Sequence, residues 1–210
     1  MINKLFQTTL TLFLLFNVFS ISFAEDDQNL ASFIVRNYDT AALPTVGNSE
    51  ADYTIIEFFD YRCSYCSKQA KDFQKLLNNK DNVKIIYMEW PIFGDISDTA
   101  AKIALIVWQR YPNLYFEVHN QFMQLGPKMK KVSIVDILNK IDLNGEEIFQ
   151  EAVGQKSNDI IDANMKLAKS LGLRGTPASI INDSIYPGYL QYKTLETLIK
   201  FDYRIIFYNK

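Results

Sequence analysis

Two cysteines with the spacing Cys-x-x-Cys stand where a β-prone run gives way to a helical one, and this junction restricts the fold more than any other feature. The run Thr54 to Phe59 is apolar apart from one acid, which predicts a largely buried strand. Apolar residues then recur at helical spacing, which predicts a helix from about Cys63 to Leu77. A second strand is predicted over Val83 to Met88. Strand, helix and strand in this order form a βαβ unit, which implies a parallel pair of strands.

The remaining chain is predicted to be a long helical block followed by two short strands and a last helix. Before the βαβ unit, residues 25–52 are interpreted as a lead-in with turns, because Pro44 and Gly47 interrupt it. Ser97 is the predicted N-cap of the first helix of the block, and Pro112 is expected to break that helix. The other predicted helices are 114–125, 132–141, 146–153, about 160–171 and 194–206, and the predicted strands are 178–181 and 184–186 about a turn at Asn182-Asp183.

The first 24 residues have the pattern of a secretory signal peptide. Lys4 is their only charge, an apolar stretch follows, and the segment ends at Ser22-Phe23-Ala24 with small residues at positions −3 and −1. Cleavage is therefore expected after Ala24, and the mature protein is expected to be exported, with the periplasm as its location. If the segment is not cleaved, it would instead attach the protein to a membrane. Either outcome places both cysteines in a compartment that permits disulfides.

Composition excludes several classes of function. A chain of 210 residues suits one domain with a well-buried core. Its formal net charge of −2 gives no electrostatic reason to expect nucleic acid as a partner. Two Cys and one His cannot supply the four soft ligands of a closed Cys/His zinc site within one chain. No metal site within one chain is therefore expected, and no cofactor is expected either.

The position of the cysteine pair predicts redox chemistry. A thiolate at Cys63 would lie at a helix N-terminus, where unpaired amides and the helix dipole lower its pKa. The sulfur of Cys66 lies one turn further along, so the pair can alternate between dithiol and disulfide. Two alternatives stay open. The pair is half of a metal site shared by two chains, or it is a purely structural disulfide, whose short loop would constrain the unfolded chain little.

Five segments together resemble a known family. The chain is similar to the thioredoxin superfamily and, within it, to the secreted DsbA-like thiol:disulfide oxidoreductases. This resemblance implies an α/β thioredoxin-like fold with an inserted helical domain. The expected division is a signal peptide at 1–24, a lead-in at 25–52, a thioredoxin-like core at 53–93 and 172–210, and the insertion at 94–171. The matching segments are Glu57-Phe58-Phe59-Asp60-Tyr61-x-Cys63-x-Tyr65-Cys66, Pro91-Ile92-Phe93-Gly94-x-x-Ser97, Tyr115-Phe116-Glu117-Val118-His119, Leu167-Ala168 through Gly175-Thr176-Pro177-Ala178, and Gly188.

The resemblance also implies roles for particular residues. Cys63 resembles the nucleophilic, exposed cysteine of the family, and Cys66 resembles its buried partner. Thr176 and Pro177 resemble a loop with a cis proline that packs beside the disulfide and pairs with the backbone of the substrate. Glu57 stands where the family often has a buried acid, which could relay protons from Cys66. The alternative for Glu57 is a solvated acid at the end of a strand.

The two residues between the cysteines depart from the best-known oxidases of the family. Those oxidases have His as the second residue, whereas this chain has Ser64 and Tyr65. A neutral tyrosine cannot add positive charge beside the Cys63 thiolate, so a milder oxidant is expected. The single histidine, His119, falls in the predicted helical block and is interpreted as structural.

The resemblance implies an enzyme that introduces disulfide bonds into exported cysteine-containing proteins. A quinone-linked membrane oxidase would then restore the Cys63–Cys66 bond. One alternative is a disulfide isomerase or reductase on the same fold, and another is an envelope protein that only binds partners. Family isomerases carry a long N-terminal dimerisation domain, whereas 28 residues span positions 25–52, so a monomer is expected.

Overall fold

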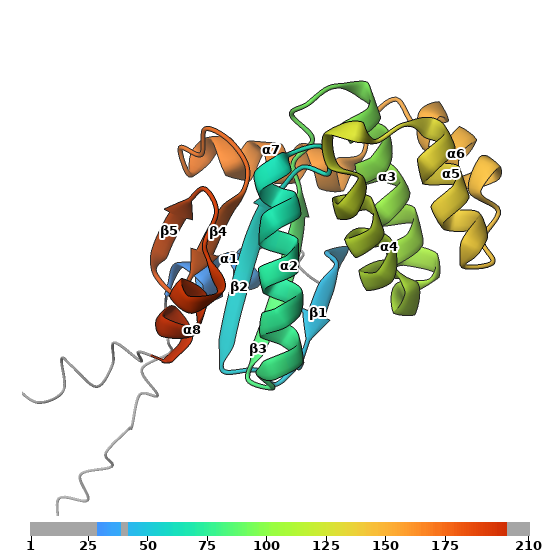
Figure 1. Ribbon diagram of the computed structural model, residues 1–210. Helices are drawn as coiled ribbons and strands as arrows, with labels where there is room; N and C mark the ends of the chain where they lie inside the picture. Colours follow the sequence, from blue (N-terminus) through green and yellow to red (C-terminus); the bar gives the residue numbers. More distant parts are fainter. Residues whose placement is uncertain (1–28, 39–41, 201–210) are drawn as a thin grey trace, which may run out of the picture.

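The computed structural model describes residues 29–38 and 42–200. The predicted signal peptide, its cleavage site and the end of the last predicted helix lie outside these residues. The centre of the molecule is a five-stranded sheet with the order β1-β3-β2-β4-β5 (Figure 1). Its strands are β1 Thr45–Gly47, β2 Tyr53–Phe59, β3 Val83–Glu89, β4 Ala178–Ile181 and β5 Ser184–Pro187.

The predicted βαβ unit is present, and the register of its strands fixes which residues share a face. Strand β2 pairs in parallel with β3, with Glu57 opposite Tyr87, while β4 runs antiparallel to β2, with Ser179 opposite Glu57 on the other side. The helix that joins β2 to β3 is α2, Ser64–Asn79. The other helices are α1 Leu30–Asn37, α3 Asp95–Arg110, α4 Pro112–Leu125, α5 Lys131–Lys140, α6 Gly145–Gly154, α7 Asp159–Ser170 and α8 Tyr192–Lys200, with a 3-10 turn η2 at Gly126–Lys128.

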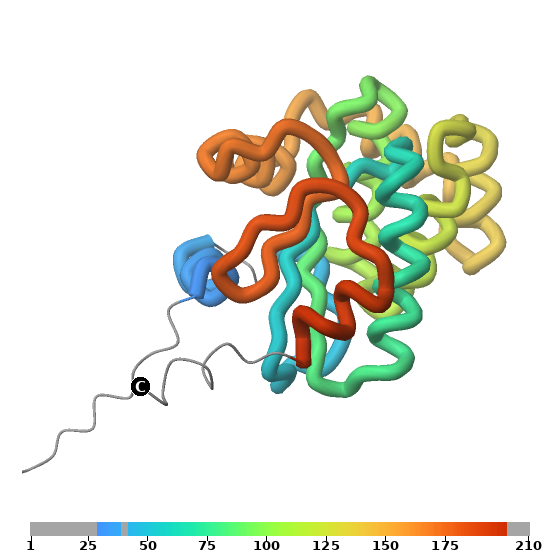
Figure 2. Tube along the Cα trace, turned by 60° about the vertical axis from the view of Figure 1, so that its left-hand side comes forward, coloured from blue at the N-terminus to red at the C-terminus, as the bar shows by residue number. Residues whose placement is uncertain are grey.

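Helices cover both faces of the sheet, as Figures 1 and 2 show from two sides. On one face α2, α3, α4 and α8 bury a continuous apolar core against β2 and β3, with Phe59 and Phe73 among its members. On the other face α1 and α7 pack on the alternate residues of the same strands, for example Ile56 and Phe58. The strands are therefore buried on both faces, which explains why their sequences are apolar runs without strict alternation.

Two expectations from the sequence are wrong in detail, and a third, the break at Pro112, is confirmed. The lead-in at 25–52 is more than turns, because it contains α1 and β1, and β1 pairs antiparallel with β3. Ser97 does not cap α3, since Gly94 is the N-cap and Ser97 lies inside the helix. Pro112 does separate two helices, but it does so as the first residue of α4, where its missing N–H removes no helical hydrogen bond.

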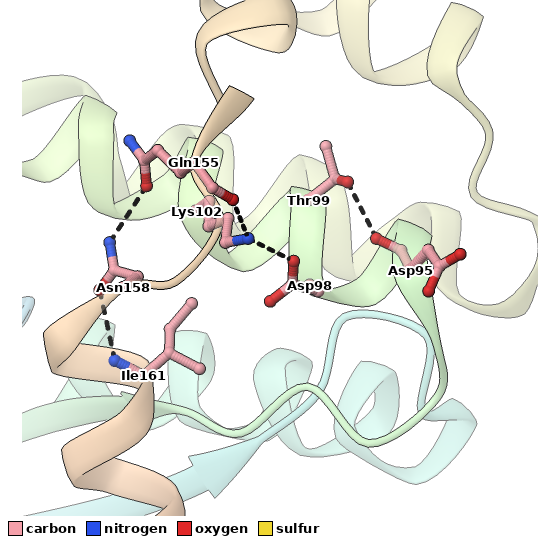
Figure 3. Close-up of polar contacts among 7 residues, drawn as sticks. All are labelled: Asp95, Asp98, Thr99, Lys102, Gln155, Asn158 and Ile161. Carbon is pink, nitrogen blue, oxygen red and sulfur yellow. Dashed lines mark hydrogen bonds and ion pairs between the residues drawn. The ribbon is translucent and has the colours of Figure 1, made fainter. Parts of the chain in front are cut away.

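Helices α3 to α7 all lie between β3 and β4 in the sequence, and partly buried polar contacts join α3, α6 and α7 (Figure 3). Lys102 on α3 is 6% exposed, and its ammonium group donates 2.8 Å to the carbonyl of Gln155, the C-cap of α6. The same ammonium pairs with Asp98 at 2.7 Å. Asn158 caps α7 by accepting from the amide of Ile161, and it donates to the side chain of Gln155. These contacts hold α3, α6 and α7 together at one point.

Candidate active site

The two cysteines lie at the start of α2, directly after β2 at the centre of the sheet. Strand β2 ends at Phe59, and the chain turns so that the amide of Cys63 donates 3.1 Å to the carbonyl of Asp60. This turn makes Cys63 the N-cap of α2, where its sulfur accepts a hydrogen bond of 3.4 Å from the amide of Cys66. Cysteine thus takes the place of the oxygen side chains that usually cap helices.

The two thiols, which are not bonded to each other in this structure, differ in their access to solvent. Cys66, in the first turn of α2, is fully buried in the core between this helix and the sheet, as expected. Cys63 is only 5% exposed, so the expectation of an exposed sulfur is wrong in degree, because Thr176 and Cys66 cover it. Cys63 is reached instead through a pocket of about 380 Å³, which is lined by Arg62, Cys63, Ser64, Tyr65, Phe93, Pro127 and Thr176.

The surroundings shift the pKa values of the two thiols in opposite directions. The pKa of Cys63 is lowered from 9.0 to about 6, chiefly by a hydrogen bond from the Cys66 thiol. The Thr176 side chain and the amides of Cys66 and Tyr65 lower it further, against the opposing effect of burial. Burial raises the pKa of Cys66 far above its ordinary value, and the neighbouring Cys63 and Glu57 add to this. The predicted lowering at Cys63 is confirmed, although the partner thiol contributes more to it than the end of the helix.

The loop before β4 brings Thr176 and Pro177 to the cysteines from more than a hundred residues away. The peptide bond between them is cis, and the Cys63 thiol donates 3.3 Å to the carbonyl of Thr176, so the expected placement of this loop is confirmed. The Thr176 hydroxyl is buried and has no hydrogen-bond partner in the described part of the chain. It is therefore available to the sulfur of Cys63.

Glu57 is fully buried in the middle of β2, which contradicts the alternative of a solvated acid. Neither of its oxygens has a hydrogen-bond partner among the described residues. Burial raises its pKa well above the ordinary value, and the negative charge that Cys63 can carry raises it further. These surroundings favour the protonated, neutral form of Glu57, and its carboxyl lies close enough to both thiols for their charges to interact.

Ser64 and Tyr65, the residues between the cysteines, form the exposed rim of the site. Tyr65 is 57% exposed, and the ammonium group of Lys68 lies 4.8 Å from the centre of its ring. Tyr65 lines the pocket, and its backbone amide helps to lower the pKa of Cys63. Sequence reasoning assigned no role to Arg62, Phe93 and Pro127 in the lining of the pocket. Phe93 belongs to one of the five segments that match the family, and this was the only sequence signal that could have placed it near the site.

His119 lies deep in the core and contacts neither cysteine, which agrees with a structural role. Its ring packs against aromatic rings of β2, β3 and α4, and its Nδ1 lies 3.2 Å from the hydroxyl of Tyr61. The same hydroxyl donates 3.1 Å to the buried carboxyl of Glu89. Burial lowers the pKa of His119 to about 3, so the ring stays neutral at physiological pH.

No group of three or more His, Cys, Asp or Glu side chains suited to a metal occurs within 29–38 and 42–200. In the same ranges no helix is long and apolar enough to cross a bilayer.

A thiol pair with opposed pKa shifts, at a helix N-terminus beside a cis proline on a mixed sheet, defines a thioredoxin-like thiol-disulfide oxidoreductase. The sequence profile described as the DSBA-like thioredoxin domain matches residues 54–200, and the chain belongs to this family. It is accordingly an enzyme of thiol-disulfide exchange, which leaves the non-enzymatic alternative without support.

Individual relatives agree with this assignment. The chain is 21% identical to the disulfide bond formation protein D of Bacillus subtilis over 167 residues, which cover 75% of each protein. A thioredoxin-like oxidoreductase from Silicibacter pomeroyi is 32% identical, with a TM-score of 0.69 over 76% of this chain and 91% of the other. The thiol-disulfide exchange protein alpha-DsbA2 from Wolbachia pipientis is 28% identical, with a TM-score of 0.71 over 81% of this chain and 94% of the other.

Proposed function

We propose that the protein is an exported oxidase that introduces disulfide bonds into other exported proteins through Cys63 and Cys66. One observation carries the direction of the reaction. The pKa of Cys63 is lowered to about 6 while that of Cys66 is raised. A thiolate that is stable in the reduced protein favours reduction of the pair, and a protein whose reduced form is favoured oxidises its substrates.

The reaction begins on the oxidised pair. A substrate thiolate attacks the sulfur of Cys63, the Cys63–Cys66 bond breaks, and the sulfur of Cys66 leaves and takes up a proton. A second substrate thiolate then attacks the substrate sulfur of the mixed disulfide, and Cys63 leaves as a thiolate. Two electrons have passed from the substrate to the pair, and the substrate holds a new disulfide.

Three further residues have roles in this proposal. Glu57 is the proton donor to Cys66, because it is buried, its pKa is raised and its carboxyl interacts with both thiols. Thr176 and Pro177 hold the extended substrate beside Cys63, since their loop contacts the sulfur directly. Ser64 and Tyr65 form the rim over which the substrate enters, as their exposure and place in the pocket suggest.

The location and the partners belong to the same proposal. The N-terminal 24 residues direct export, and the periplasm supplies folding proteins with free cysteines. A quinone-linked membrane oxidase removes the electrons and restores the Cys63–Cys66 bond. Residues 53–93 and 172–210 form the thioredoxin-like core of a monomer, and 94–171 form its helical insertion, in keeping with the position of α3 to α7 between β3 and β4.

One observation favours a second candidate, an isomerase or reductase on the same fold. Tyr65 replaces the charged residue of the strongest oxidases, so one source of oxidising power is missing. The redox state of the cysteine pair in cells separates the two candidates. It is measured by trapping free thiols with acid and then labelling them. A mostly oxidised pair supports the oxidase, whereas a mostly reduced pair contradicts it and supports the isomerase or reductase.

A further inference from the structure

Asp60, directly after β2, is a buried carboxylate with only 1% of its surface exposed. Its Oδ1 accepts hydrogen bonds from the amide of Arg62 at 2.7 Å and from the hydroxyl of Ser97 at 2.8 Å. Its Oδ2 accepts from the amides of Ile92 at 2.7 Å and of Phe93 at 3.0 Å. A buried carboxylate is tolerated where donors replace its water, and these four donors also fix its orientation.

The two oxygens of Asp60 bind two different segments. Oδ1 accepts from the amide of Arg62, two residues later, and the main-chain carbonyl of Asp60 accepts from the amide of Cys63. These two hydrogen bonds shape the turn before the reactive cysteine. Oδ2 binds the loop 91–94, which leaves β3 and leads into α3. The guanidinium of Arg62 adds a second link to that loop, since its Nη1 donates 2.9 Å to the carbonyl of Phe93. One side chain thus joins the reactive turn to the neighbouring loop.

The loop 91–94 supplies one wall of the pocket beside Cys63. Phe93 lines this pocket together with Tyr65 and Pro127, and 48% of its surface is exposed. An exposed ring owes its position to its backbone more than to packing around the side chain. The backbone of Phe93 is held from both sides, at its amide by Asp60 and at its carbonyl by Arg62.

We propose that Asp60 is a positioning residue for substrate binding: it holds Phe93 as the apolar wall beside Cys63. The substrates favoured in this way are peptides with an apolar side chain next to the reacting cysteine. This rests on the proposed function, because a pocket beside Cys63 selects substrates only if Cys63 exchanges disulfides with them. Asp60 acts through Phe93 on the affinity for a peptide, whereas a small dithiol that reaches the sulfur without touching the wall is much less affected.

The substitution Asp60→Ser tests this role. A serine hydroxyl can still accept from the amide of Arg62, but it is too short to reach the amides of both Ile92 and Phe93. The test compares oxidation of a peptide with two cysteines and an adjacent phenylalanine with oxidation of dithiothreitol. The ratio of the two rate constants should fall by about tenfold, equivalent to about 1.4 kcal/mol of lost binding, through a higher KM and not through kcat.

Ser97→Ala is the matched control. It removes one of the four donors to the same carboxylate without touching the loop 91–94, so the ratio should stay as in the wild type. If the rates with the peptide and with dithiothreitol fall equally in Asp60→Ser, the residue acts on the sulfur and the inference is wrong.

If Asp60→Ser does not fold, Phe93→Ala tests the inference in the same assay. This substitution changes an exposed side chain and leaves every contact of Asp60 in place. It must reproduce the selective rise in KM, and an unchanged KM overturns the inference. Failure of the proposed function looks different, since the cysteine pair would then be mostly reduced in cells, whatever the ratio of the two rate constants in Asp60→Ser.

Discussion

Lowering the pH through about 6 should protonate Cys63 in the reduced protein and thereby change how its reduction potential depends on pH. The direction of this change in the reduction potential follows from the number of protons that the reduced pair binds. Above this pH the reduced pair holds a thiolate at Cys63 and a thiol at Cys66, whose pKa is raised, so reduction takes up two electrons and one proton. Below it the reduced pair holds two thiols, so reduction takes up two protons.

The size of the effect follows from the pKa of about 6 against the ordinary 9.0. At neutral pH about 90% of Cys63 is then thiolate, against about 1% for an ordinary thiol. This favours the reduced form by at most about 1.4 kcal/mol, or about 30 mV for a two-electron couple. These are upper values, because the pocket leaves the sulfur partly solvated. The potential should fall by about 60 mV per pH unit on the acid side of the Cys63 pKa and by about 30 mV per unit above it.

Equilibration with glutathione redox buffers from about pH 5 to about pH 8, with the reduced fraction determined by mass spectrometry, measures these slopes. The ultraviolet absorbance of the thiolate gives the midpoint independently. In Cys66→Ala the midpoint should move to higher pH, because the thiol that contributes most to the lowering is removed. A single slope of about 60 mV per unit up to about pH 8, with no absorbance midpoint near 6, would refute the reasoning.

Three further outcomes are expected. After incubation with oxidised glutathione, Cys66→Ala should carry a mixed disulfide by mass spectrometry, whereas Cys63→Ala should carry almost none, because burial raises the pKa of Cys66. Glu57→Gln should slow mixed-disulfide formation by about a hundredfold in stopped-flow measurements, since it removes the buried proton donor, and an unchanged rate would exclude that role. Lys102→Met should lower the free energy of unfolding in urea by about 1–3 kcal/mol, because it leaves the Gln155 carbonyl unpaired, while the exchange rate per folded molecule should not change.

The features that the sequence determines are those encoded in neighbouring residues. The βαβ unit, the helical block and the hairpin after Pro177 follow from spacing of apolar residues, because the core-facing side of each helix or strand repeats with its own period. The Cys-x-x-Cys pair at a strand-helix junction also predicts the lowered pKa of Cys63, because the amides of the first helical turn lie next to Cys63 in the sequence. Strand β1 escaped prediction, because three residues at a sheet edge carry too little pattern.

Tertiary structure alone decides what lies against these elements. The contact between Cys63 and Thr176 joins positions 113 apart, and neither local sequence contains a signal for it beyond family resemblance. Burial of Glu57 depends on helices that cover β2 from elsewhere in the chain, so its raised pKa has no local cause. Ser97 has the chemistry of a helix cap, yet its hydroxyl donates to Asp60 in the assembled fold. Period and propensity act over a few residues, whereas desolvation and hydrogen bonding of buried groups depend on every segment that packs around them.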